Sequence, residues 1–262
     1  MMFNKKSNVS AMSRAYAGFT LAEVLITLLV IGVVAALTIP TLMANTQKAQ
    51  YVTALKKAYT TWNQVLVQMS TDKGSPGDLS KSDLFAAGTT GATFGEEAVK
   101  YFNVVKICRA GESGCVTINS STYTGLPKAT WGEDTTAFRF ITADGMSYTI
   151  DRTAAANPDC SNDNSWFADP NIITAVSQSC GWLEVDVNGL KGPNNWGRDI
   201  FRFYITNGRG PSLYPDGGTE STMQWKEDDG SVEGNVVGCF SGNIDGRTCA
   251  GRVIEESWEM NY

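Results

Sequence analysis

The sequence predicts an α+β protein in which a long N-terminal helix packs on an antiparallel β-sheet. Residues 19–43 form an almost entirely apolar run, and an amphipathic pattern continues it to residue 69. Residues 71–262 hold 24 of the 26 glycines and show several short strand patterns. All six cysteines lie beyond residue 100. These observations indicate one long helix and a strand-based head whose loops are joined by disulfides.

The first half of the predicted helix, residues 19–43, is long and apolar enough to cross a membrane. At ~1.5 Å per residue it spans about 37 Å, against a hydrocarbon core of ~30 Å. Glu23 is its one charged residue. Near a helix end that charge costs less than the many Val, Leu and Ile residues gain on insertion. Residues 1–18 hold three basic and no acidic residues, so we expect them to stay in the cytoplasm while the remainder is exported.

The second half, residues 44–70, is predicted to be an amphipathic helix that continues into the head. Its apolar side chains recur at spacings of three and four residues, at Val52, Leu55, Tyr59, Trp62, Leu66 and Met69. A segment with glycine and proline at residues 72–77 ends the helix. We expect the apolar stripe to pack on the protein's own sheet rather than on a partner.

The head, residues 71–262, is predicted to consist of strands and long loops. The strongest strand patterns are residues 101–108, 137–143, 146–151, 182–187 and 200–206. Asp144-Gly145 forms the turn of a hairpin between the second and third of these. Residues 207–262 are rich in glycine and acidic residues, and we expect an irregular C-terminal region there.

The composition excludes several kinds of functional site. The chain has no histidine, which excludes Ser-His-Asp and Cys-His catalysis and any His-ligated metal. With 27 acidic and 21 basic residues its net charge is -6, so nucleic acid is not indicated as a partner. No other arrangement of residues frames a catalytic site, and we expect the protein not to be an enzyme.

The cysteines favour three local disulfides in an oxidising compartment. Consecutive pairs are 7, 20 and 10 positions apart: Cys108 and Cys115, Cys160 and Cys180, and Cys239 and Cys249. Buried free thiols and a cysteine-type zinc site are alternatives, although no C-x-x-C pair occurs. Pairing in series is the simplest connectivity, and the sequence alone does not decide it.

Three interpretations compete for the N-terminal segment. A secretory signal peptide has small residues at a cleavage site after its apolar run, whereas here the small residues 15–18 precede the run. A simple membrane anchor explains the apolar run but not its acidic residue. The third interpretation comes from residues 18–26, GFTLAEVLI, which resemble the prepilin-type cleavage and methylation signature of type IV pilins and type II secretion pseudopilins. One departure is Ala17, where the signature has Lys or Arg.

The resemblance implies a processing site followed by an assembly helix. A prepilin peptidase would cut between Gly18 and Phe19, remove residues 1–18 as a leader, and methylate the new amine of Phe19. Glu23 would pair with that amine in a neighbouring subunit. The other positions implied in assembly are Thr20, Gly32 and Pro40. Because proline removes one helical hydrogen bond, we expect a bend or local melting near Pro40.

By the same resemblance, the function is structural. The chain would be a subunit of a type IV pilus-like or type II secretion filament that polymerises through its N-terminal helix. The implied partners are identical or related pilin subunits, the prepilin peptidase, an inner-membrane assembly platform and, before assembly, the membrane. The precursor would cross the inner membrane once, with its head in the periplasm or outside the cell. The alternative is a stand-alone membrane-anchored protein that binds a glycan or surface ligand.

One loop of the head, residues 186–199, is rich in side-chain oxygen. It resembles the D-x-N-G…K-G-P-N…G-x-D loop found between strands in many pilin-like proteins. Oxygen atoms of Asp186, Asn188, Asn194 and Asp199 are of the kind that binds a structural Ca²⁺ ion, although the glycine spacing is not that of an EF-hand. The favoured interpretation is a structural turn whose Asp and Asn side chains bond to nearby backbone, and calcium is the alternative.

Overall fold

A computed structural model describes residues 18–86, 88–109, 112, 114–115, 120–121, 127–128, 137–151, 160, 178–208, 210–216, 225–226, 232–233, 239 and 246–262. The chain divides into two compact units, residues 1–46 and residues 47–262. The predicted leader, apart from Gly18, lies outside the described residues.

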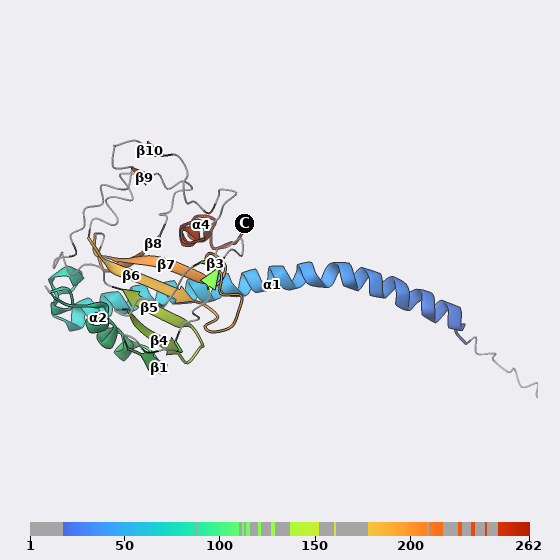
Figure 1. Ribbon diagram of the computed structural model, residues 1–262, viewed down its shortest axis with the longest axis horizontal. Coiled ribbons are helices and arrows are strands. Elements are labelled where there is room, and N and C mark those ends of the chain that lie inside the picture. The colour runs from blue at the N-terminus through green and yellow to red at the C-terminus, as the bar shows by residue number, and fades with distance from the viewer. Residues whose placement is uncertain are drawn as a thin grey trace, which may run out of the picture. The chain divides into compact units, whose positions relative to one another are not determined.

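One helix, α1 (Leu21–Asp72), joins the apolar and amphipathic segments and ends where the sequence predicts (Figure 1). Its first part is long and apolar enough to cross a membrane. The helix runs unbroken through Pro40, so of the two expected alternatives, a bend or local melting, the local melting does not occur, and the bend stays a prediction. The physical reason is that proline deletes one backbone hydrogen bond, while the bonds on either side still hold the turn.

Six antiparallel strands form the main sheet in the order β1-β4-β5-β6-β7-β8. Their bounds are β1 (Val104–Cys108), β4 (Phe138–Thr142), β5 (Ser147–Asp151), β6 (Ser179–Asp186), β7 (Ile200–Thr206) and β8 (Ser212–Pro215). The β4–β5 hairpin turns at Asp144-Gly145 as predicted, and Gly145 has the positive φ of 88° that such a turn favours. Two short pairs stand apart, β2 (Ser120–Ser121) with β3 (Pro127–Lys128) and β9 (Trp225–Lys226) with β10 (Val232–Glu233).

Parts of the strand prediction are wrong. Residues 99–101 form a 3₁₀ turn, η3 (Val99–Tyr101), and the strand begins only at Val104. The C-terminal region is not wholly irregular, because it contains β8 and the helix α4 (Cys249–Glu255). Both are too short to show a clear periodicity, and burial in the folded head decides their structure. The helix α2 (Gly91–Ala98) and the turns η1 (Leu79–Lys81) and η2 (Asp83–Phe85) were not predicted either.

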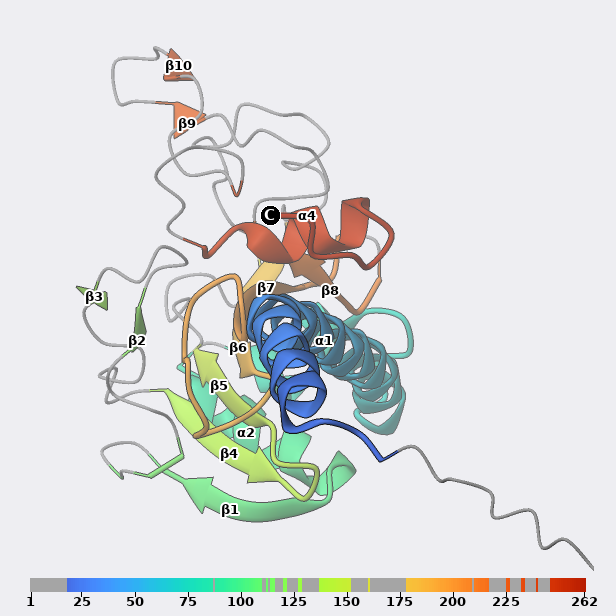
Figure 2. The same cartoon turned by 90° about the vertical axis from the view of Figure 1, so that its right-hand side faces the viewer.

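The second half of α1 packs on the sheet and builds the core of the head (Figure 2). Five of the six stripe residues are buried, and the sixth, Tyr59, is half-buried with its ring 5.6 Å from that of Phe203. Trp62 is fully buried among aromatic rings of the head. The prediction that the stripe packs on the protein's own sheet is therefore confirmed.

Candidate functional site

The N-terminal end of α1 brings Thr20 and Glu23 together. The backbone N–H and the hydroxyl of Thr20 donate to Glu23 Oε2 at 2.9 and 2.8 Å, and the Glu23 N–H donates to the Thr20 hydroxyl at 3.2 Å. This reciprocal pair is a capping box, which satisfies backbone donors in the first helical turn. The glutamate also lies at the positive end of the helix dipole. Within the described part of the chain, the carboxylate of Glu23 has hydrogen bonds but no ion pair.

Apart from Glu23, the helix presents an apolar surface over residues 21–46. No ion pair or polar network occupies this stretch among the described residues. The large apolar side chains are all exposed, at Leu21, Val24, Leu25, Ile26, Leu28, Leu29, Val30, Ile31, Val33, Val34, Leu37, Ile39, Leu42 and Met43. Gly32 adds no side chain to this surface, and the space beside its Cα is open. A continuous apolar surface of this kind needs lipid or other apolar helices around it.

The end of β6 and the loop that follows it to β7, residues 186–199, bring the four predicted oxygen-bearing residues together. Asp186 ends β6 and Asp199 immediately precedes β7, and both are fully buried. The carboxylate of Asp199 accepts the backbone N–H groups of Asn194 and Asn195 at 2.8 and 2.6 Å. The carboxylate of Asp186 accepts the N–H of Asn188 at 3.1 Å. The predicted bonding of side chains to nearby backbone is therefore present.

These bonds do not cancel the effect of burial on the pKa values of the two carboxyl groups. Burial, with a further contribution from the charge of Asp199, raises the pKa of Asp186 to about 9. Burial also raises the pKa of Asp199, although the N–H groups of Asn195 and Asn194 act in the opposite direction. Among the described residues neither carboxylate has a Lys or Arg nitrogen within 4.0 Å. Burial thus favours the protonated, neutral form of the Asp186 carboxyl at neutral pH.

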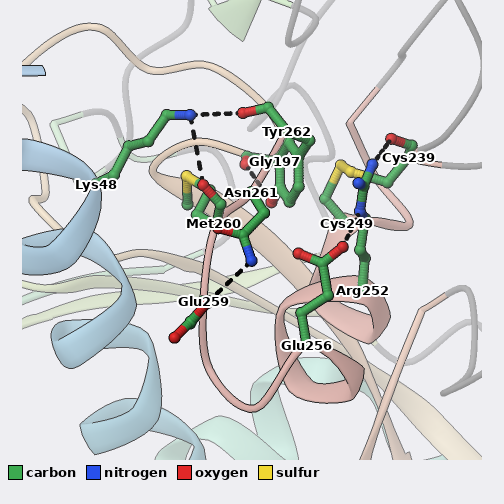
Figure 3. Close-up of polar contacts among 10 residues, drawn as sticks. All are labelled: Lys48, Gly197, Cys239, Cys249, Arg252, Glu256, Glu259, Met260, Asn261 and Tyr262. Atoms are coloured by element: carbon green, nitrogen blue, oxygen red, sulfur yellow. Dashed lines mark hydrogen bonds and ion pairs between the residues drawn. A yellow bond between two sulfur atoms is a disulfide. The ribbon is translucent and has the colours of Figure 1, made fainter. Parts of the chain in front are cut away.

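The C-terminal tail is fixed to α1 and to the β6–β7 loop by polar contacts (Figure 3). Lys48 Nζ donates to the carbonyl oxygen of Tyr262 at 2.6 Å, and the Tyr262 hydroxyl donates to the carbonyl oxygen of Gly197 at 2.8 Å. Arg252 of α4 stacks on the Tyr262 ring at 4.9 Å and donates to the carbonyl oxygen of Cys239 at 2.7 Å. The tail therefore contacts α1, the β6–β7 loop and α4.

A comparison with known families gives one match. The profile of the prokaryotic N-terminal methylation motif matches residues 13–39. The chain carries the type IV pilin and pseudopilin signature. The signature covers the predicted cleavage junction, the capping box and the apolar surface of α1 up to Ile39. No curated protein and no solved structure matches the chain.

The pilin-type signature gives the fold a general interpretation. It indicates a pilin-like or pseudopilin subunit, made as a membrane-anchored precursor, with a structural rather than an enzymatic role. It also implies, in general terms, that the partners of the protein are other pilin subunits and a prepilin peptidase. The long apolar helix and the antiparallel sheet agree with the predicted pilin-like architecture.

The six cysteines form three disulfides in series, which join Cys108 to Cys115, Cys160 to Cys180 and Cys239 to Cys249. All three lie in the head. Disulfides persist in oxidising compartments, which agrees with export of the head across the membrane.

Sequence reasoning found the oxygen-bearing side chains of the β6–β7 loop but missed their surroundings. The backbone groups of Lys191 and Asn195 that face these side chains carry no sequence signal, because any residue supplies a carbonyl and an N–H. The cluster of Lys48, Arg252 and Tyr262 was missed as well, since its members are up to 214 positions apart. Only the folded chain brings them together.

Proposed function

We propose that the protein is a structural subunit of a type IV pilus-like or type II secretion filament, which polymerises through the apolar half of α1. The observation that carries the proposal is the single carboxylate of Glu23, four residues after the predicted new terminus in a helix that is otherwise uncharged to Met43. A membrane anchor needs no such charge, and a charge inside a membrane is costly unless an opposite charge or other polar group pairs with it.

The proposed processing creates the missing partner for this charge. Cleavage between Gly18 and Phe19 by the prepilin peptidase removes the leader and leaves a positive amine, which the peptidase methylates. The capping box satisfies part of Glu23 through hydrogen bonds to Thr20 but leaves its net charge uncompensated. In the proposal, the Phe19 amine of a neighbouring subunit supplies the opposite charge and so sets the register between subunits.

The apolar surface of residues 21–46 then has two successive environments. Before assembly it is surrounded by lipid of the inner membrane, and after assembly by the same helices of other subunits. Gly32 allows a close approach between helices because no side chain occupies the space beside it. An inner-membrane assembly platform is the proposed partner for the transfer between these environments, and the head is proposed to face the periplasm or the cell exterior.

The experiment compares Glu23→Gln with wild type in cells that carry the assembly machinery. Glutamine keeps the length of the side chain and its hydrogen-bonding oxygen, so the variant removes the charge while the capping box is still possible. We expect the precursor to insert and to be cut normally, and the yield of sheared filaments to fall at least about tenfold, since about 1.4 kcal/mol at each subunit contact corresponds to that factor.

The matched control is Glu96→Gln in the head, which removes one charge from the exposed ion pair with Arg109. Its filament yield should equal that of wild type. Normal filaments from Glu23→Gln would contradict the proposed assembly and favour a stand-alone membrane-anchored binding protein.

A further inference from the structure

A cavity of about 310 Å³ lies between α1, the segment that precedes β1 and the β4–β5 hairpin. The inner part of its lining is mostly apolar, because Ala58, Met146 and Tyr148 are all buried. The half-buried ring of Phe102 completes this apolar part, and its centroid lies 5.8 Å from that of the Tyr148 ring. Small-molecule sites have volumes of roughly 300–1,000 Å³, so this cavity has room for one small molecule.

The charged side chains of the lining are exposed and therefore lie at the mouth of the cavity. Lys57 of α1 and Asp144 of the hairpin form an ion pair there, with Nζ 2.7 Å from Oδ2. The other oxygen of Asp144 accepts the hydroxyl of Thr142, which orients the carboxylate. The side chain of Asn103 is also exposed at the mouth and has no hydrogen-bond partner in the described part of the chain. The cavity is thus polar at its mouth and apolar inside.

The two adjacent charges at the mouth select the kind of ligand. A ligand with one charge would be attracted by one member of the ion pair and repelled by the other. A ligand whose negative and positive groups are on the same carbon atom can pair with both, through its carboxylate at Lys57 and its ammonium group at Asp144. A sugar has hydroxyl groups on every side, and those that enter the apolar interior would lose their hydrogen bonds to water.

We propose that this cavity binds a free α-amino acid with an aromatic side chain. The carboxylate of the ligand pairs with Lys57 Nζ, and its ammonium group pairs with the carboxylate of Asp144. Its side chain enters the cavity and contacts the rings of Phe102 and Tyr148. These rings and the thioether of Met146 interact more favourably with an aromatic ring than with an aliphatic group of the same size. The site belongs to the head alone and is independent of the proposed role in a filament.

The test is a titration of L-phenylalanine into the full-length chain in detergent micelles, followed by NMR of isotope-labelled methionine methyl groups. The signal of Met146, assigned with Met146→Leu, should shift with a Kd on the order of 0.1–1 mM, as for a ligand of about a dozen heavy atoms. The signal of Met43, in the apolar half of α1, should not move. Phenylpropionate and phenylethylamine each lack one charged group, so each should bind at least about tenfold more weakly.

Two variants each remove one charge from the mouth of the cavity. Lys57→Gln and Asp144→Asn should each raise the Kd for L-phenylalanine at least about tenfold. Both should fold, because Lys57 is exposed and an Asn-Gly pair suits the tight turn of the hairpin as well as Asp-Gly does. The matched control is Lys56→Gln. Lys56 is the neighbouring residue of α1, but it lies over the ring of Trp258 at 5.6 Å and is not among the residues that line the cavity, so this variant should bind as wild type does.

Three results would overturn the proposal. The first is a Met146 signal that does not shift at about 10 mM L-phenylalanine, tenfold above the weakest expected Kd. The second is an equal Kd for wild type, Lys57→Gln and Asp144→Asn, or for L-phenylalanine and the two analogues with one charge. The third is tighter binding of glucose than of L-phenylalanine, which would indicate a sugar site. The measurement uses isolated subunits, so its outcome does not depend on whether the protein forms filaments.

Discussion

Replacing Trp62 tests whether the second half of α1 is an integral part of the core. The indole is fully buried, and its ring centroid lies 4.8 Å from that of Phe102, 5.7 Å from Tyr148 and 6.2 Å from Phe140. Trp62→Ala removes these contacts and leaves a cavity, which costs about 3–5 kcal/mol in the free energy of unfolding. For a domain of this size, that loss corresponds to a fall in unfolding temperature of roughly 6–20 °C.

Trp62→Phe should lower the free energy of unfolding by much less than the smaller volume of phenylalanine suggests. The indole N–H has no hydrogen-bond acceptor among the described residues, and burying such a donor costs about 1–3 kcal/mol. Phenylalanine keeps most of the aromatic packing and removes this donor, so we expect a net loss below about 2 kcal/mol.

The assay is thermal unfolding of the full chain in detergent with its disulfides oxidised, followed by near-ultraviolet circular dichroism, which reports the packing of aromatic side chains. Val67→Ala is the matched control, because Val67 lies on the same helix but is 52% exposed, and it should change the unfolding free energy by less than about 0.5 kcal/mol. The reasoning is refuted if Trp62→Ala unfolds like the control, or if Trp62→Phe is as unstable as Trp62→Ala.

Three further predictions concern the head. Hydrogen bonds from Lys81 and Ser80 lower the pKa of Asp78 to about 2, so this group stabilises the head above about pH 4 and loses that contribution as the pH falls towards 2. Solvent screening limits the contribution to about 1 kcal/mol, and Asp78→Asn should remove it from acid unfolding curves while leaving any other pH dependence in place. Gly246→Ala should cost at least about 2 kcal/mol in chemical unfolding, because φ is +93° and a Cβ would lie 2.1 Å from the carbonyl oxygen of Trp196. Gly74→Ala is the control, since Gly74 has φ of +73° but open space around its Cβ position, and it should lower the free energy of unfolding by less than Gly246→Ala does. Equal losses of stability in the two variants would argue against the steric clash at Gly246. Lys57→Ala breaks an exposed ion pair of 2.7 Å with Asp144 and should change stability by less than about 1 kcal/mol, so a larger loss in the same assay would contradict this view of the pair.

The features predicted well are those that repeat along the chain. The apolar run and the three- and four-residue spacing from Val52 to Met69 specify the long helix, since a core-facing stripe on a helix has this period. The β4–β5 hairpin follows from Asp144-Gly145 between two strand patterns, because this pair accepts the backbone angles of a tight turn.

The features missed depend on contacts between distant residues. The helix α4 has only seven residues, and the burial of Ala250 and Val253 in the shared core is not visible in so short a pattern. The β6–β7 loop contains one feature that the sequence predicts and one that it does not. Its side-chain oxygens were found from the sequence, but the approach of Asn194 to the carbonyl oxygen of Lys191 is a property of the folded backbone.

The central claim is that the apolar helix becomes the N-terminal end of an assembled subunit. The most direct measurement is mass spectrometry of the intact protein and of its N-terminal peptide, purified from cells that contain the prepilin peptidase. We predict a chain that begins with N-methylated Phe19, immediately before the capping residue Thr20. A chain that begins at Met1, or one cut after Met43 so that the helix is lost, would contradict the account.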